Sequence, residues 1–192
     1  MRDVNWGKHR NRVSSFWKAI EGCSIGPIDR VAIEAKKALD RGNKILTCGN
    51  GGSACEASHF VGELVGRFSI ERPAFPALCL NDNGGVLTCI SNDYSFEDIF
   101  ARQLEAHCKD GDMFFVFSTS GNSKNIITAL KYAKENFNIK TVGMLGNKGG
   151  ECLELVDYPI LVPSYDTALI QEVHLSIVHF ICTFIDINYE KK

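Results

Sequence analysis

The segment KILTCGNGGSACEASHFVGEL, residues 44–64, sets the expected fold class. It opens with the apolar run ILTC, turns through Gly49-Asn50-Gly51-Gly52, and continues with helical spacing. An apolar strand that leads through a glycine turn into a helix is the repeating unit of a parallel α/β sheet. The chain on either side of this segment shows the same alternation.

Short β-branched or aromatic runs bounded by Gly, Pro, Asn or Asp alternate with helical patterns along the chain. Strands are predicted at residues 44–48, 77–80, 113–118, 141–145 and 159–162. Helices are predicted at residues 28–41, 53–66, 96–107, 122–136 and 167–190. Several strands are continuously apolar, which is typical of strands covered on both faces. We therefore predict an α/β three-layer sandwich with a mainly parallel five-stranded sheet, of the flavodoxin or Rossmann-like type.

The first forty residues stand outside this alternation. Val13, Phe16, Trp17 and Ile20 recur with the spacing of one apolar helical face. We predict an N-terminal helical extension over residues 1–42, packed on the domain or on a neighbouring subunit, followed by an α/β domain over residues 43–192.

The composition excludes several classes of protein. The 192 residues are 45% hydrophobic and 23% charged, as in a soluble globular domain. The net charge of −2 gives no overall field that would attract nucleic acid, and no apolar run reaches the roughly 18 residues of a membrane span. The first residues lack the apolar core of a secretory signal. We expect a cytoplasmic protein without a nucleic-acid or membrane partner.

The cysteine content fits a cytoplasmic protein. The chain has 8 cysteines, and no two of them form a C-x-x-C pair, which disfavours a zinc ribbon or a thioredoxin-like motif. Most lie inside apolar runs, and we expect them to be buried and reduced.

The glycine turn after the first strand is a candidate ligand site, because an open parallel sheet binds ligands at the carboxyl ends of its strands. Ser53 is a candidate cap for the following helix, whose free N–H groups favour an anion. Three uses remain open for the turn: a structural one, binding of an anion or sugar, and binding of a dinucleotide, because it also matches G-x-G-x-x-A. The acidic partner of a dinucleotide should follow about 20 residues later. The candidate after the next strand lies 28 residues beyond the motif, so we predict no nucleotide cofactor.

A second polar turn follows the predicted strand at 113–118. Ser118, Thr119, Ser120 and Ser123 place four hydroxyls beside the start of a helix. Hydroxyls and backbone N–H groups together can hold a phosphate group without a fixed positive charge, or they can simply cap the helix. The sequence has no lysine in the P-loop spacing, so ATP hydrolysis is not expected.

Two helices carry titratable candidates. His59 and Glu63 are four residues apart on one helical face, where they form either a surface pair or part of a zinc site. On the last helix, Gln171 and His179 differ by about 80° and can border one cavity, whereas His174 and His179 differ by about 140°. Spacing alone does not choose between the two histidines.

A further polar group precedes the predicted helix at 96–107. Asn92 or Asp93 could cap this helix. The alternative is that either side chain bonds the hydroxyl groups of a sugar.

Taken together, these segments resemble the sugar isomerase (SIS) domain family, and more narrowly its phosphoheptose isomerase branch. The matching motifs are CGNGGSACEASHFVGELVGRF, ERPAFPALCLND, SNDYSFEDIFARQLEA, DGDMFFVFSTSGNSKNIITAL and IQEVHLSIVH. STSGNS is typical of SIS domains in general. The combination of GNGGS, H-x-x-x-E and Q-E-x-H-x-x-x-x-H is much more specific to the heptose branch.

The resemblance implies an aldose–ketose isomerase that converts sedoheptulose 7-phosphate to D-glycero-D-manno-heptose 7-phosphate through a metal-stabilised enediolate. This reaction begins the supply of activated heptose for lipopolysaccharide, capsule or glycoprotein. The resemblance also implies a homotetramer with active sites between subunits and one zinc ion per subunit.

The resemblance assigns roles to individual residues. The implied zinc ligands are His59, Glu63, Gln171 and His179, which selects His179 over His174. In the implied mechanism Glu63 carries the proton between carbons, and His179 handles protons at the oxygens. The implied substrate-binding residues are Asn50, Gly51, Gly52, Glu63, Asn92, Asp93, Ser118, Thr119, Ser120, Ser123 and Gln171.

Two departures from the family pattern affect the expected substrate contacts. Ala168-Leu169 stands where family members commonly have a polar or basic residue, and Ser95 replaces a small glycine. There are three alternatives. The first is a non-catalytic SIS-domain adaptor or sugar-phosphate sensor, including a replication-initiator-binding protein. The second is an isomerase of a hexose or pentose phosphate, and the third is a dinucleotide enzyme. The joint presence of the four implied zinc ligands favours the enzyme over an adaptor.

Overall fold

Five parallel strands form the central sheet of the computed structural model, which describes residues 6–189 and, within them, the side chains of residues 13–189. The strands are β1 (Ile45–Gly49), β2 (Ala77–Cys79), β3 (Met113–Ser118), β4 (Lys140–Gly146) and β5 (Tyr158–Val162). Their order in the sheet is β2-β1-β3-β4-β5, and every neighbouring pair is parallel. The predicted sheet is confirmed, and each strand end lies within one residue of its predicted place.

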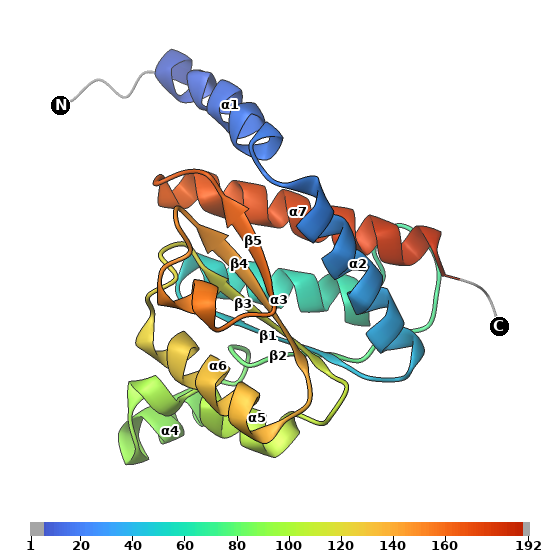
Figure 1. Cartoon of the computed structure of the whole chain (residues 1–192), viewed down its shortest axis with the longest axis vertical. Coiled ribbons are helices and arrows are strands. Elements are labelled where there is room, and N and C mark those ends of the chain that lie inside the picture. The colour runs from blue at the N-terminus through green and yellow to red at the C-terminus, as the bar shows by residue number, and fades with distance from the viewer. Residues whose placement is uncertain (1–5, 190–192) are drawn as a thin grey trace.

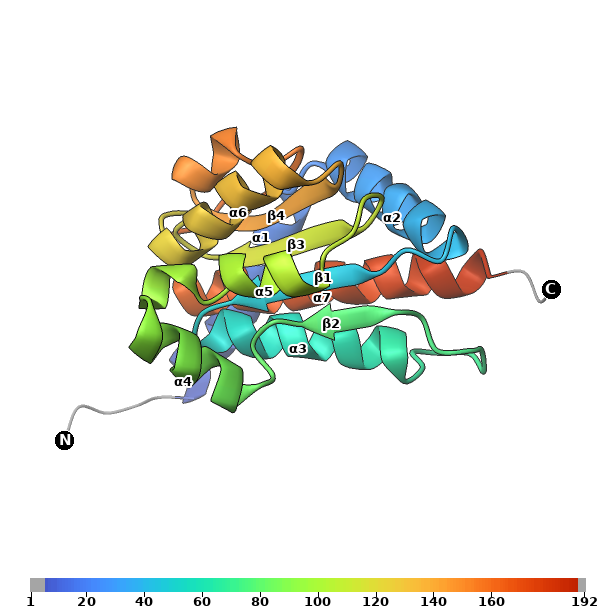
Figure 2. The same cartoon turned by 90° about the horizontal axis from the view of Figure 1, so that it is seen from below.

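Helices cover both faces of the sheet, as Figures 1 and 2 show. One face is covered by α2 (Ile25–Asp40), α3 (Gly52–Val65) and α7 (Thr167–Ile187). The other face is covered by α4 (Gly84–Asp93), α5 (Ala101–His107) and α6 (Lys124–Asn136). Two short 3₁₀ helices, η1 (Phe96–Asp98) and η2 (Glu151–Glu154), lie in the connections. The predicted three-layer α/β sandwich is therefore confirmed.

The core divides into two apolar clusters, one on each side of the sheet. Phe115 and Phe117 of β3 pack with α2, α3 and α7, whereas Phe114 and Val116 pack with the helices of the opposite face. All four side chains are fully buried. Burial of each such side chain favours folding by about 1.5–3 kcal/mol before conformational entropy is counted. The sheet therefore gives the loops at its carboxyl edge a rigid base.

The structure contains a helix, α4, that the sequence pattern does not predict. The Asn-Gly-Gly run at residues 83–85 has the composition of a turn. In the structure Asn83 is the N-cap of α4, and its side chain accepts a hydrogen bond from the Val86 N–H at 3.1 Å. The turn residues thus start a helix instead of ending a strand.

The predicted helix at 96–107 is split into η1 and α5, and its expected cap is wrong. Asn92 and Asp93 form the last turn of α4 and do not cap the next element. Ser95 caps η1, because its hydroxyl accepts a hydrogen bond from the Glu97 N–H at 3.1 Å. The departure from glycine at this position therefore has a local structural role.

The N-terminal helix α1 (Trp6–Glu21) projects beyond the rest of the fold in Figure 1. Phe16 and Ile20 pack against the core, but Val13 and Trp17 are 56% and 59% exposed. The predicted apolar face is therefore only half covered. Residues 1–5 of the proposed extension lie outside the described residues, and its proposed boundary falls in the turn between α2 and β1.

By length and composition α7 could cross a membrane, because it is 21 residues long, has a high mean hydropathy and contains few charged residues. Half of its most apolar window is buried inside the fold, and Val173, Val178 and Ile181 are fully buried in the core. α7 is therefore a core helix of this domain. Its predicted end at Glu190 lies outside the described residues; in the structure α7 ends at Ile187.

Candidate active site

The candidate site begins where the strand order of the sheet reverses. β1 and β3 are neighbours, but the chain leaves β1 toward β2 on one side and leaves β3 toward β4 on the other. Such a point opens a crevice at the carboxyl ends of the two strands, where ligands of this fold type bind. The glycine turn after β1 and the hydroxyl turn after β3 both start there.

The glycine turn is held in place by a neighbouring side chain. Asn81, which follows β2, accepts a hydrogen bond from the Gly49 N–H at 3.0 Å and donates one to the Gly49 carbonyl at 2.9 Å. Gly51 has a positive φ of 57°, which favours glycine, and it is the N-cap of α3. Ser53 is therefore not the cap, because α3 begins one residue earlier than predicted.

Asn50 joins the two turns through a pair of amide hydrogen bonds. Asn50 Nδ2 donates to Asn125 Oδ1 at 2.9 Å, and Asn125 Nδ2 donates to Asn50 Oδ1 at 2.9 Å. Asn125 lies in the first turn of α6 and is only 2% exposed. Sequence reasoning missed Asn125, since a lone polar residue in a helical pattern gives no signal. This pair fixes the orientation of the Asn50 side chain beside the candidate crevice.

The hydroxyl turn uses two of its serines to organise its own backbone. Ser118 Oγ accepts a hydrogen bond from the Gly121 N–H at 3.0 Å, and Ser120 Oγ accepts one from the Asn122 N–H at 3.2 Å. A hydroxyl that accepts in this way can still donate its own O–H to a ligand. Ser123 holds the N-cap position of α6, and within the described residues its side chain makes no capping bond. Thr119 is partly exposed at the start of the turn.

Three possible metal donors come together from two helices. His59 and Glu63 lie on α3 and His179 lies on α7, and their donor atoms are all within 4.8 Å of one another. His59 Nε2 is 3.0 Å from His179 Nε2 and 3.1 Å from Glu63 Oε1. Donor atoms around a tetrahedral zinc ion are roughly 3.3 Å apart, given zinc–ligand bonds of about 2.0–2.1 Å. The spacing therefore fits a small divalent cation.

The ring of Phe68 stacks on His179 with the ring centroids 5.7 Å apart, which restricts the rotation of that imidazole. His59 is 41% exposed and Glu63 is 22% exposed, so the donor cluster is open to solvent on one side. An open side is a feature of catalytic metal sites, which keep one coordination position for water or substrate.

Gln171 lies at the glycine turn. Its Nε2 is 3.4 Å from Ser53 Oγ, and a Cβ atom on Gly52 would lie 2.5 Å from the same nitrogen. Glycine at position 52 thus lets α7 approach the turn. The assignment of Gln171 as a metal ligand stays a prediction.

His174 lies in the core, away from the donor cluster. It is fully buried, its ring meets Phe117 edge-on at 6.1 Å, and its Nδ1 is 3.8 Å from Glu56 Oε2. Over the described part of the chain, the side-chain polar atoms of His174 and Glu56 have no hydrogen-bond partner. The structure therefore separates the two histidines of α7, as their angular difference predicts.

Asn92 and Asp93 are exposed at the end of α4, which Figure 2 shows at the same end of the sheet as the beginning of α3. Asn92 Nδ2 donates to Asp93 Oδ1 at 2.8 Å. The other carboxylate oxygen of Asp93 accepts from the Cys89 thiol at 3.5 Å, and this hydrogen bond raises the pKa of Cys89. Among the described residues, neither side chain bonds to the two turns.

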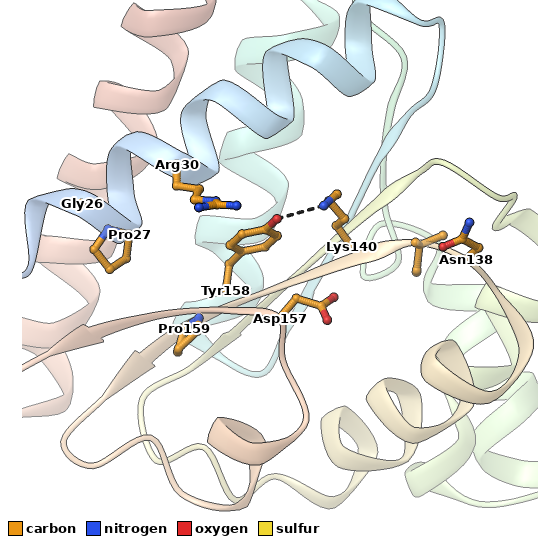
Figure 3. Close-up of a pocket in the computed structure, with 9 residues that line it drawn as sticks. Gly26, Pro27, Arg30, Asn138, Lys140, Asp157, Tyr158 and Pro159 are labelled. Carbon is orange, nitrogen blue, oxygen red and sulfur yellow. Dashed lines mark hydrogen bonds between the residues drawn. The ribbon is translucent and has the colours of Figure 1, made fainter.

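A hollow of about 840 Å³ lies at the opposite end of the sheet and is not part of this site (Figure 3). It is formed where β4 and β5 begin, beside the start of α2. Arg30, Lys140 and Asp157 give it mixed charge, and Lys140 Nζ donates to the Tyr158 hydroxyl at 2.9 Å.

The family profile of the SIS domain matches residues 8–146, and the chain belongs to the SIS-domain family. Within that family it is similar to phosphoheptose isomerases. It is 50% identical over 168 residues to the phosphoheptose isomerase of Geobacter sp. strain M21, covering 88% of this chain and 87% of the relative. The chain is accordingly a member of the phosphoheptose isomerase branch.

Solved structures agree with this assignment. The phosphoheptose isomerase of Francisella tularensis superposes with a TM-score of 0.91 at 33% identity, covering 97% of this chain and all of that one. The phosphoheptose isomerase of Neisseria gonorrhoeae superposes with a TM-score of 0.86 at 34% identity, covering 94% of this chain and 98% of that one.

Proposed function

We propose that this protein is a phosphoheptose isomerase that converts sedoheptulose 7-phosphate to D-glycero-D-manno-heptose 7-phosphate. The observation that carries the proposal is the donor cluster of His59, Glu63 and His179 on α3 and α7, in a fold whose two polar turns lie at a switch point of the sheet. A sugar-phosphate sensor or adaptor would need the hydroxyl turn but not three converging donor atoms. The product would then enter the biosynthesis of activated heptose.

The reaction moves a proton between neighbouring carbons through a cis-enediolate. It needs a group that carries this proton, a group that handles protons at the two oxygens, and positive charge near the developing oxyanion. Glu63 is the proposed base, since its carboxylate can take the proton from one carbon and return it to the next. His179 is the proposed acid–base partner at the oxygens.

The proposed cofactor is one zinc ion per subunit. Two imidazoles and a carboxylate are donors that suit zinc. Bound there, the ion would polarise the carbonyl group and stabilise negative charge on the enediolate oxygens. Gln171 is the proposed fourth ligand. In the structure its amide lies against the glycine turn, with Nε2 3.4 Å from Ser53 Oγ.

The hydroxyl turn is the proposed anchor for the phosphate group. Its serines lie at the start of α6, where free N–H groups and the helix dipole favour an anion. His59 lies seven residues along α3 from Gly52, or about 10 Å. Gly52 belongs to the glycine turn, which the Asn50–Asn125 pair joins to the hydroxyl turn. A ligand that reaches from these turns to the donor cluster is therefore elongated, as is a seven-carbon sugar with a terminal phosphate. Binding the remote phosphate would position the reacting carbons.

The proposed assembly is a cytoplasmic homotetramer with sites between subunits. Trp17 on α1 is 59% exposed, Ile25 at the start of α2 is 73% exposed and Phe180 on α7 is 42% exposed. Large apolar side chains of this kind favour burial against another subunit. The exposure of His59 agrees with a site that a second subunit completes.

One assay tests the proposed function. Zinc-loaded protein is incubated with sedoheptulose 7-phosphate, and the aldoheptose phosphate product is followed by NMR or mass spectrometry. Turnover by the wild type and its loss in Glu63→Gln would support the proposal. Binding of the substrate without turnover would refute it and favour a sensor. Faster turnover of a hexose or pentose phosphate would identify a different SIS isomerase.

A further inference from the structure

A buried ion pair lies beyond the donor cluster, between the connection that follows α3 and the end of α7. Arg72 Nε donates to Asp186 Oδ1 at 2.8 Å, and each side chain is only 1% exposed. The two residues are 114 positions apart in the sequence. The proposed mechanism gives neither of them a role.

The guanidinium of Arg72 also binds the carboxyl end of α3. Its Nη2 donates to the Glu63 carbonyl at 2.8 Å, and its Nη1 donates to the Leu64 carbonyl at 3.0 Å. The last carbonyls of a helix have no partner within the helix. Arg72 therefore caps α3 at the residue that carries the proposed base.

The second oxygen of Asp186 holds the connection itself. Asp186 Oδ2 accepts hydrogen bonds from the Ser69 N–H at 2.8 Å, the Ser69 hydroxyl at 2.9 Å and the Ile70 N–H at 3.2 Å. Ser69 directly follows Phe68, whose ring stacks on His179. Asp186 thus ties α7 to the segment that restrains one of the proposed donors.

These contacts join the two helices that carry the donors. Arg72 binds the backbone of Glu63 on α3, and Asp186 lies seven residues beyond His179 on α7, which is about 10 Å. The donor atoms of His59 and His179 meet across the same helix pair at 3.0 Å. A shift of α3 along or away from α7 would change that distance directly.

We infer that Arg72 is a positioning residue for the donor cluster, acting through the Glu63 backbone and through Asp186. The inference rests on the proposed metal site. Stability alone does not account for the pair, because a buried ion pair can often be replaced by apolar residues of similar volume without loss of stability. An apolar pair cannot supply the hydrogen bonds to Glu63 and Ser69.

The test compares cobalt(II) affinity with thermal stability in four proteins. Cobalt(II) is the probe because its visible absorption reports coordination geometry independently of turnover. The proteins are the wild type, Arg72→Met, the double variant Arg72→Met/Asp186→Leu, and Asp112→Asn. Asp112 is the control, because it is a buried acid paired with Lys44, and among the described residues its carboxylate accepts hydrogen bonds from Lys44 and Lys109 and not from α3 or α7.

We expect Arg72→Met to lower both the melting temperature and the cobalt affinity, since it leaves Asp186 buried without its partner. The double variant should regain most of the lost melting temperature. Its cobalt affinity should stay about 10–100-fold below wild type, as for the loss of groups that orient metal ligands. Asp112→Asn should have a lower melting temperature than the wild type but bind cobalt with unchanged affinity and spectrum.

Three results would overturn the inference. Wild-type affinity and spectrum in the double variant would make the pair purely structural, as would a cobalt affinity that simply follows the melting temperature in all four proteins. A wild-type protein that binds no cobalt would refute the metal site and the inference together. A wild type that binds cobalt but does not isomerise heptose phosphate would refute the proposed function alone, because the cobalt comparison still decides the role of Arg72.

Discussion

Replacing each of the two histidines of α7 by alanine should have opposite effects on the protein. His179→Ala should lose the metal and the activity while the fold persists. His174→Ala should lose stability while it keeps the metal and the activity. The contrast follows from position, since His179 Nε2 is 3.0 Å from His59 Nε2, whereas His174 is fully buried against Phe117.

The magnitudes follow from these surroundings. Removing the His174 ring leaves a cavity and leaves Glu56 buried without its neighbour, at a cost of about 2–4 kcal/mol. For a domain of this size that cost lowers the melting temperature by about 4–16 °C. His179 is half-buried, and its truncation should change the stability of the metal-free protein by less than about 1 kcal/mol. Loss of a metal ligand should lower metal affinity by more than the 10–100-fold that is typical when a group that only hydrogen-bonds to a ligand is removed.

The assay measures zinc per subunit after dialysis, turnover well below the melting temperature, and the thermal melt of the metal-free protein. His174→Gln, which keeps a polar side chain of similar size, is the second variant if His174→Ala does not fold. If His174→Ala loses the metal and His179→Ala retains it, the assignment is inverted. If neither variant changes turnover, α7 has no catalytic role and a sensor becomes the better account.

Four further predictions follow from the site and the core. Glu63→Gln should lower kcat by about 10²–10⁴-fold with an unchanged melt, and retention of more than about one-hundredth of kcat would exclude Glu63 as the base. Thr119→Ala and Ser120→Ala should each weaken binding of the phosphorylated substrate by about 1.5–3 kcal/mol and spare free heptulose; equal losses for both ligands in calorimetry would place the phosphate elsewhere. Burial alone would raise the pKa of Asp186, but hydrogen bonds from Arg72 and Ser69 outweigh it and hold the pKa below its ordinary value. The stabilising effect of this carboxylate should therefore be complete above pH about 4 and be lost as the pH falls through the lowered pKa. In urea unfolding, the difference in stability between wild type and Asp186→Asn should be constant from about pH 5 to 7 and shrink below about pH 4. Burial raises the pKa of the Cys79 and Cys152 thiols to about 11 and of Cys108 and Cys182 to about 12, so at pH 8 a thiol reagent should modify only the exposed Cys55 and Cys89 in the native protein. Cys89 should react more slowly than Cys55, because its hydrogen bond to Asp93 raises its pKa, and reaction of a third thiol would show that the core opens.

The sheet could be predicted closely because its strands are apolar on both faces and short. MFFVFS at 113–118 has no polar residue before its last position, and it becomes the central strand. α4 could not be predicted, because Asn83 followed by two glycines favours a turn in any local pattern, and only the tertiary fold shows that the asparagine caps a helix.

Within the candidate site, local spacing was sufficient for contacts inside one helix and insufficient between helices. The four-residue spacing of His59 and Glu63 predicts their pairing, which the structure shows at 3.1 Å. The choice of His179 over His174 depended on the family resemblance. Asn125 and Arg72 had no local signal, because their partners lie 75 and 114 residues away in the chain.

α7 is synthesised after all five strands, and it supplies both His179 and a large part of the apolar layer over one face of the sheet. Until the ribosome has released this helix, Phe117, Met144 and Val162 lack one of the three helices that cover their face of the sheet, and α2 and α3 cover it only in part. Parallel sheets that form late and expose apolar surface are prone to aggregate and depend on chaperones. A chain truncated before α7 would therefore be a substrate for proteases and not a partly active enzyme. The same helix would then complete the proposed metal site and protect the new chain from cellular quality control.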